Sequence, residues 1–365
     1  MAEISTIVDT PADLSALKAQ FRARGFYRKP TGRILLQLLL HGLTAGTGLV
    51  LIVGTDGFWP AALGVVMFTA GQVGLATNTH TSAHFATSNR RWLNQALTYL
   101  GYPLMLGLGA TYWWSKHNAW HHGSPNVLEV DEDIQLKPWF AFCEDEVRSA
   151  GPLARLYYRV QWISLPVIML MSLQLQLSSV RYLLRTARSP RGWTSAHWLD
   201  AALLALSWTL WVGLPLAVWP AWDVVGFTAM RLVVMSCTLF AVFAPAHMPA
   251  EAHALHDAQR GDDPILLQTS TTLNFRTGAL GAWLISGLQF QIEHHLFPGV
   301  SHVYYPSMSG LVADFCRRNG YPYRTLGWGE GLWKTFAAFA HPRPVTDGLA
   351  SRAGHGPFGT ARRRL

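Results

Sequence analysis

The chain contains 365 residues, of which 50% are apolar and only 14% are charged. Soluble proteins carry about 25% charged residues, so this sequence has too little charge to cover a soluble globular surface. The apolar content and the 16 tryptophans also exclude an intrinsically disordered chain. Composition therefore indicates an integral membrane protein.

The net charge is +8, and the basic residues flank apolar segments. This placement predicts topology signals and contacts with anionic membrane lipid, and it predicts no nucleic-acid partner. The three cysteines are far apart in the sequence, which excludes a disulfide framework and a zinc knuckle. Histidine is the unusual residue type, with 15 copies.

The first 30 residues have no long apolar core, so we predict a cytoplasmic N-terminal segment without a cleavable signal peptide. Within this segment, Pro11 to Arg22 has the pattern of a short amphipathic helix, with Thr10 as its N-cap. Residues 346–365 are polar, rich in glycine and basic, and we predict a disordered tail there.

On length alone, six apolar stretches qualify as membrane spans: residues 34–53, 57–76, 92–114, 160–180, 201–222 and 232–245. The basic residues distinguish between them, because Lys and Arg accumulate on the cytoplasmic side. The turns at 54–57 and 220–223 contain neither residue, whereas basic clusters lie before residue 34, at 90–91 and at 181–191. All of these clusters are cytoplasmic only if the stretches 92–114 and 160–180 do not cross.

We therefore predict an all-α integral membrane protein with four transmembrane helices in two hairpins, at about 34–53, 58–77, 199–219 and 224–245. The other two stretches are predicted to be buried or interfacial helices. The N-terminus, the C-terminus and a histidine-rich cap then all face the cytoplasm. Arg231 lies inside the last span, where it needs a buried partner or must reach the interface.

Histidines follow the ends of the predicted spans. His80 and His84 are spaced i and i+4, as are His117 and His121, so each pair shares one face of a helix. His122 is expected to point about 100° away from His121. One helix turn is thereby predicted to supply ligands to two metal ions.

The third group, Gln291-Ile292-Glu293-His294-His295, follows the last span, and His247 lies just beyond the apolar end of that span. The groups supply eight candidate imidazole ligands: His80, His84, His117, His121, His122, His247, His294 and His295. Imidazole suits iron, copper and zinc, and eight nitrogens exceed one coordination shell, so two metal ions are predicted. A zinc protease is disfavoured because the sequence has no HExxH motif.

Five carboxylates near these groups are predicted to accept hydrogen bonds from the ring N–H groups of the ligands: Glu129, Asp131, Glu132, Asp133 and Glu293. His41 lies in the middle of the first span, and we predict an interhelical hydrogen bond for it.

The motifs HxxxH at 80–84, HxxxHH at 117–122 and QxxHH at 291–295 resemble the membrane fatty acid desaturase family in order and spacing. The resemblance extends over about residues 70–310, and residues 31–345 are then predicted to be the desaturase domain. Residues 116–118, 125–127 and 131–133 are similar to the second box of the family and its downstream Asn and Asp. Residues 289–298 are similar to the third box of its front-end, linoleoyl-CoA type branch, where Gln replaces the first histidine. His247 takes a position where the family commonly has one further ligand.

This resemblance implies an O₂-dependent acyl desaturase with two non-haem iron ions, which introduces a cis double bond into an acyl chain on CoA, a carrier protein or a lipid. Gln291 is expected to bind metal, to hold a metal-bound water or to orient a neighbour. The sequence contains no haem-binding His-Pro-Gly-Gly motif, so electrons are expected from a separate protein such as a ferredoxin or cytochrome b5. The first box has Thr81 where the family often has an acidic residue.

The family chemistry also implies a dry tunnel for the acyl chain, and five aromatic residues are candidates for its lining: Trp113, Trp114, Trp120, Trp283 and Phe290. Arg90, Arg91 and Lys116 are candidate contacts for a phosphate-bearing head group. Two alternatives stay open. The same scaffold could act as a hydroxylase, ketolase or acetylenase, which only product analysis separates. A metal transporter would instead place polar ligands near the membrane midplane.

Overall fold

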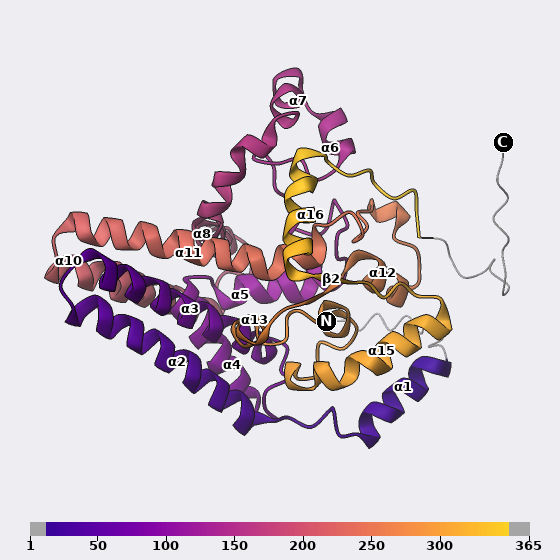
Figure 1. The fold of residues 1–365 in the computed structure, drawn as a ribbon, viewed down its shortest axis with the longest axis horizontal. Coiled ribbons are helices and arrows are strands. Elements are labelled where there is room, and N and C mark those ends of the chain that lie inside the picture. Colours follow the sequence, from indigo (N-terminus) through magenta and orange to yellow (C-terminus); the bar gives the residue numbers. More distant parts are fainter. Residues whose placement is uncertain (1–11, 350–365) are drawn as a thin grey trace.

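The computed structural model describes residues 12–349, and helices make up most of it (Figure 1). The only sheet within these residues has two short parallel strands, β1 (Asn274–Arg276) and β2 (Thr325–Gly327), with Phe275 opposite Leu326. The mostly helical fold agrees with the predicted class.

Five helical segments are long and apolar enough to cross a membrane. They are α2 (Thr31–Gly54), α3 (Phe58–Ala83), the continuous η3 (Gln161–Leu170) and α8 (Met171–Ala187), the continuous α9 (Ser195–Trp208), η4 (Thr209–Gly213) and α10 (Leu214–Val218), and α11 (Ala221–His247). Four of these segments coincide with the predicted hairpin helices. The fifth, η3 with α8, lies where we predicted an interfacial or buried stretch. The structure therefore offers five candidate spans, and the four-span topology stays a prediction.

Close backbone contact holds α2 against α3. A Cβ atom on Gly48 would lie 2.3 Å from the backbone nitrogen of Phe68, and one on Gly71 would lie 2.5 Å from that of Ala45. Only glycine permits this approach at both positions. Small residues at helix–helix contacts are typical of membrane proteins, in which van der Waals packing replaces the hydrophobic effect.

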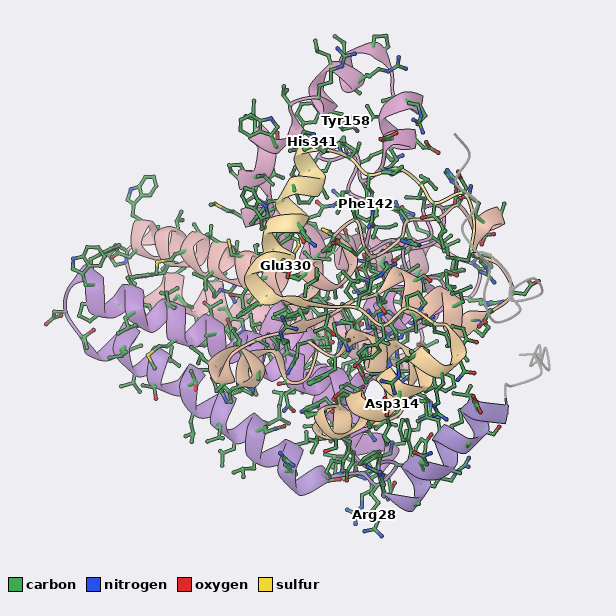
Figure 2. All side chains as sticks on the ribbon, turned by 45° about the vertical axis from the view of Figure 1, so that its right-hand side comes forward. Arg28, Phe142, Tyr158, Asp314, Glu330 and His341 are labelled. Atoms are coloured by element: carbon green, nitrogen blue, oxygen red, sulfur yellow. The ribbon has the colours of Figure 1, made fainter. Side chains whose placement is uncertain are left out.

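The outer face of α2 is apolar and open. Leu36, Leu39 and Leu43 are 57%, 57% and 58% exposed, and the side chains along this helix in Figure 2 consist mainly of carbon. Such a surface is unfavourable in water and stable against hydrocarbon. By contrast, the side chain of Arg28, just before α2, points away from the fold, as expected of a residue at a membrane surface (Figure 2).

After α3, between Arg91 and His121, the chain forms four short helical pieces. They are α4 (Arg91–Tyr99), η1 (Leu100–Leu106), α5 (Ala110–Trp113) and η2 (Trp114–His121). Both η1 and η2 are π-helices, Pro103 lies inside η1, and Gly107 follows in the left-handed region with φ +70°. Proline and the left-handed residue interrupt a regular α-helix. This stretch is not among the five candidate spans, because its helical pieces are short and because α4 and η2 are less apolar than the spans.

The remaining elements gather at one end of the long helices, and most of them form a cap there (Figure 1). They are α1 (Ala12–Ala23), α6 (Glu144–Ser149), α7 (Pro152–Tyr158), η5 (Asp257–Gln259), α12 (Pro264–Thr271), α13 (Ala279–Ile285), α14 (Gln291–Leu296), η6 (His302–Tyr304), α15 (Tyr305–Asn319) and α16 (Trp328–Ala340). The N-terminal α1 packs on α15, and Phe21 and Phe315 are fully buried in their shared core.

The predictions for the two ends of the chain fall only partly within the described residues. The helix predicted at Pro11 to Arg22 is observed as Ala12–Ala23, while Thr10, its predicted cap, lies outside the described residues. The predicted tail is outside them from residue 350 onward. At its start, the backbone N–H groups of Thr346 and Leu349 donate to the carbonyls of Ala254 and Gln259.

His41 and Arg231, the two polar residues predicted inside spans, are both buried. The hydrogen bond predicted for His41 is wrong, because neither ring nitrogen has a partner. Its ring instead lies against Trp283, with centroids 4.4 Å apart, in the space that Gly74 leaves open. Arg231 is 8% exposed and has no carboxylate partner within residues 12–349, so the buried ion pair is not found.

Candidate metal centre

All nine predicted site residues converge from four elements. These are the end of α3 with His80 and His84, η2 and its C-cap with His117, His121 and His122, the end of α11 with His247, and α14 with Gln291, His294 and His295. Seven of the nine are buried, and only His84 and His122 are partly exposed.

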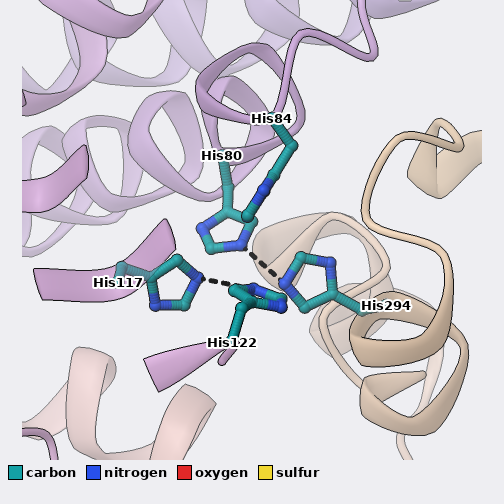
Figure 3. Close-up of side chains that lie close together, drawn as sticks. All are labelled: His80, His84, His117, His122 and His294. Atoms are coloured by element: carbon teal, nitrogen blue, oxygen red, sulfur yellow. Dashed lines mark hydrogen bonds between the residues drawn. The ribbon is translucent and has the colours of Figure 1, made fainter. Parts of the chain in front are cut away.

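Five histidines form one group, the five-histidine group, which consists of His80, His84, His117, His122 and His294. Each offers a ring nitrogen, and these nitrogens all lie within 4.8 Å of one another. Figure 3 shows the five rings facing a common centre from α3, η2 and α14. The Nε2 atoms of His80 and His294 are 3.0 Å apart, and those of His117 and His122 are 3.1 Å apart.

His121, His247 and His295 form a second group, the three-histidine group, again with ring nitrogens within 4.8 Å of one another. All three are buried. The groups are adjacent, because the rings of His122 and His295 stack with centroids 4.4 Å apart. His117, His121 and Asp133 form a smaller overlapping group between them.

The division of the second box between the groups differs from the prediction. His117 and His121 were expected to share a face, and their rings do stack, with centroids 5.1 Å apart. His122 was expected to be turned away from them, as in an α-helix. In the π-helical η2, the backbone N–H of His122 instead donates to the carbonyl of His117 at 3.0 Å. This i→i+5 geometry places His122 beside His117 in one group, while His121 joins the other.

The Nδ1 atoms of four histidines are occupied by protein partners. His80 contacts the Tyr102 hydroxyl at 3.0 Å, His294 the Tyr305 hydroxyl at 3.2 Å, His295 the Gln268 side-chain oxygen at 2.8 Å and His121 the Asp131 carboxylate at 2.9 Å. Such contacts fix a ring and direct its other nitrogen. Tyr102, Gln268 and Tyr305 were not predicted, because they lie 22, 27 and 11 residues from the ligands they contact and belong to no box.

Asp131 organises the three-histidine group. Its fully buried carboxylate accepts hydrogen bonds from the ring of His121 and from the backbone N–H groups of Asn126 and Asp133. The amide of Asn126 donates in turn to the carbonyl of His247 at 2.9 Å. One short segment thus connects ligands from η2 and α11.

The carboxylate predictions are confirmed for Asp131 and corrected for two others. Glu293 is fully buried but accepts from Tyr323 at 2.6 Å and Asn274 at 2.8 Å instead of from a ligand histidine. Burial raises the pKa of this carboxyl above its ordinary value, although both donors oppose the effect. Glu129 instead accepts from His256, outside either group. Asp133 lies 3.3 Å from His121.

The ionisation of the rings favours metal binding. Burial, followed by the neighbouring imidazoles, holds the pKa values of His84, His122 and His294 well below the ordinary range. Burial also lowers the pKa of His117 to about 4. His121 differs: burial alone would lower its pKa, but Asp131 and Asp133 raise it. Neutral rings keep the lone pair that a metal ion requires.

The donor atoms also fit metal ions in their geometry. Five buried ring nitrogens have no hydrogen-bond partner: Nε2 of His84 and His295, and Nδ1 of His117, His122 and His247. Leaving a buried polar atom unsatisfied costs about 1–3 kcal/mol, so a bound metal ion at this cluster would remove that cost. Two nitrogens that bind one ion at about 2.1 Å and at a right angle are about 3.0 Å apart, as the Nε2 atoms of His80 and His294 are.

The comparison with known proteins identifies the family. The sequence profile of the fatty acid desaturase family, described as "Fatty acid desaturase", matches residues 57–327, a range that contains every histidine of both groups. The chain belongs to the fatty acid desaturase family. It is therefore an oxidoreductase of the desaturase class, and its histidine groups fit the two-metal site expected of that class.

Several desaturases are similar over most of this chain. Delta(8)-fatty-acid desaturase 2 of Arabidopsis thaliana is 25% identical over 340 residues, which cover 90% of this chain and 74% of the relative. The sn-1 linoleoyl-lipid 6-desaturase of Arthrospira platensis is 26% identical over 292 residues, which cover 74% and 75%. The Delta(8)-fatty-acid desaturase of Euglena gracilis is 29% identical over 291 residues, which cover 74% and 66%.

A cavity of about 470 Å³ adjoins the histidines of this desaturase, within the usual size of ligand sites. His80, His117, His121, His247 and His294 line it on one side, and so does Gln291. The Gln291 side chain is buried and contacts His247. Its place beside the three-histidine group agrees with the expected position near metal.

Among the five aromatic residues predicted to line a tunnel, Trp113 lines this cavity. The other four do not. Trp114 donates to the carbonyl of Ala83 and Trp283 packs on His41, while Trp120 is 52% exposed. Phe290 lines a separate surface depression beside Tyr323. Spacing in the sequence indicates an interfacial aromatic residue but not the direction of its side chain.

Proposed function

We propose that the chain is an O₂-dependent fatty acyl desaturase that introduces a cis double bond into an acyl chain at a histidine-ligated di-iron centre. The observation that carries this proposal is the pair of adjacent histidine groups beside one cavity. The five-histidine group would hold one iron ion and the three-histidine group the other. When bound and reduced, the irons supply the O₂-dependent oxidation that removes two neighbouring hydrogens.

The chain's own residues would bind the metal ions, orient the ligand rings and exclude water from the substrate. Tyr102, Tyr305 and Gln268 contact one ring nitrogen of their histidines and leave Nε2 for metal. Gln291 is proposed to complete the three-histidine group, either as a ligand or by holding a metal-bound water. The apolar cavity wall keeps the methylene that reacts away from bulk water.

The proposed setting is a multi-pass membrane protein with residues 31–345 as the desaturase domain. In it, four helices cross the bilayer, and both termini and the metal centre face the cytoplasm. Exposed leucines on α2 and the basic residues before it support this orientation. A fatty acyl chain on CoA, a carrier protein or a lipid would be the substrate, and a separate ferredoxin or cytochrome b5 would supply electrons. Several relatives are named for positions 5, 6 and 8, which supports front-end desaturation.

Expression in a host of defined lipid composition tests the proposal. Mass spectrometry of extracted fatty acids should show a product that has lost two hydrogens and gained no oxygen, with the double bond near the carboxyl end. The His294→Ala variant is the matched control, and it should insert into the membrane without forming this product. A product that has gained oxygen would assign the chain to hydroxylation or ketolation instead, and the absence of any product would refute the proposal.

A further inference from the structure

One face of α8 lines the cavity along the whole helix. The lining residues recur every three or four positions, as one face of a helix requires: Met171, Gln174, Leu175, Ser178, Arg181, Tyr182 and Arg185. From Met171 to Arg185 this face rises by about 21 Å. Its first half presents Met171 and Leu175 together with the polar Gln174, and its second half ends in two arginines.

The wall contributed by α11 is apolar until it reaches the metal centre. Leu239, Phe240 and Phe243 line the apolar part, and His247 of the three-histidine group ends the same helix. Leu106 and Leu108, from the segment after α4, also line the apolar part. The cavity is therefore amphipathic in the same sense as an acyl chain with a polar head group.

The two arginines have no carboxylate partner within residues 12–349, and both are exposed. Lys116, which lines the same cavity, forms an ion pair with Asp133 at 2.5 Å. Glu132 is the other carboxylate at this end. The two arginines therefore leave positive charge in excess.

The predicted head-group contacts differ from these residues. Arg90 and Arg91 do not line the cavity, and Arg91 lies over the ring of Phe85 at 5.5 Å. Lys116 lines it but is paired. Positive charge beside a span does not show which residues line the cavity.

We propose that Arg181 and Arg185 bind the phosphate of the acyl carrier, either coenzyme A or a phospholipid head group, while the acyl chain occupies the apolar part of the cavity. This inference rests on the proposed function. Guanidinium groups bind phosphate through paired hydrogen bonds, and the hydroxyls of Ser178 and Tyr182 lie on the same face. Two arginines one turn apart match the several oxygens of a phosphate better than the single carboxylate of a free fatty acid.

The test compares Arg181→Ala/Arg185→Ala with Arg188→Ala/Arg191→Ala in the purified full-length, iron-loaded protein. The second pair removes the same charge from the chain just beyond this face of α8, from side chains that do not line the cavity. The probes are linoleoyl-CoA and dilinoleoyl phosphatidylcholine in bicelles. Their dissociation constants are measured without turnover, and the apparent KM and kcat are measured with it.

We expect the Arg181/Arg185 variant to bind one of the two probes about tenfold more weakly or worse, with a matching rise in KM and a smaller change in kcat. A loss confined to linoleoyl-CoA identifies the coenzyme as the carrier, and a loss confined to the lipid identifies the phospholipid. Arg181→Lys/Arg185→Lys should recover part of the affinity. Unchanged iron content in the alanine variant shows that it has folded.

Equal affinities in wild type and the Arg181/Arg185 variant for both probes would overturn the inference. An equal loss in the Arg188/Arg191 control would overturn it as well, since the effect would then be one of surface charge. If the wild-type protein forms no double bond from either probe, the proposed function fails. The binding comparison still decides the role of the arginines in that case.

Discussion

Replacement of Asp131 by asparagine probes how the three-histidine group is held. The aspartate accepts three hydrogen bonds, two at Oδ2 from His121 and Asn126 and one at Oδ1 from the Asp133 N–H. The asparagine amide nitrogen cannot accept. We expect it to take the Oδ1 position, because only one hydrogen bond is lost there, and this leaves the partly buried N–H of Asp133 without a protein partner.

The cost of this change follows from those contacts. A fully buried N–H without a partner costs about 1–3 kcal/mol, so the partly buried N–H of Asp133 costs about 1 kcal/mol, at the lower end of that range. The bond from His121 weakens by about 1 kcal/mol more when its acceptor becomes neutral. Much of this cost is borne by the orientation of His121. Loss of the partner of a metal-binding histidine typically lowers metal affinity by about 10–100-fold, or about 1.4–2.7 kcal/mol. We therefore expect Asp131→Asn to lose one iron ion per chain to a chelator that leaves the other bound.

The assay titrates purified protein with chelators of graded affinity and measures retained iron by mass spectrometry. Glu129→Gln is the matched control, because it also converts an acid to an amide in this segment but contacts His256 outside both groups. The reasoning is refuted if Asp131→Asn holds both ions as tightly as Glu129→Gln does.

Three further predictions concern other parts of the molecule. Gln291→Ala should abolish double-bond formation while Gln291→His retains some, as measured by product analysis, and wild-type activity in the alanine variant would remove Gln291 from the site. Arg343→Ala should lower the thermal unfolding temperature and the iron content, because the buried guanidinium donates to the carbonyls of His247 and Pro249. Each carbonyl left without a donor costs about 1–3 kcal/mol, and Arg343→Lys should recover only part of the lost stability. Single cysteines introduced between residues 115 and 195 should react with an impermeant reagent only after the membrane is opened, whereas labelling from the external side would contradict the four-span topology.

The ligand set could be predicted because metal chemistry leaves a dense local pattern. Seven of the eight histidines lie in short motifs, and the eighth, His247, ends an apolar helix. All eight are brought together in the structure. Their division into groups was not predictable from α-helical spacing, because η2 is a π-helix.

The supporting residues and the substrate path depend on tertiary structure. Tyr102 lies in another π-helix, η1, and contacts His80 across the packed interior. Arg181 and Arg185 belong to a basic cluster that the sequence explains fully as a topology signal, and only the cavity distinguishes them from Arg188. His41 was assigned a hydrogen bond from its polarity, yet close packing of α2 on α3 gives it an aromatic neighbour instead.

The iron content of the purified chain tests the central claim most directly. Mass spectrometry should find two iron ions per wild-type chain, and replacement of a ligand in either group, His84→Ala or His295→Ala, should reduce this number while the protein still inserts into the membrane. One iron ion per wild-type chain, zinc in place of iron, or an unchanged content in both variants would contradict a di-iron centre divided between the five-histidine and three-histidine groups.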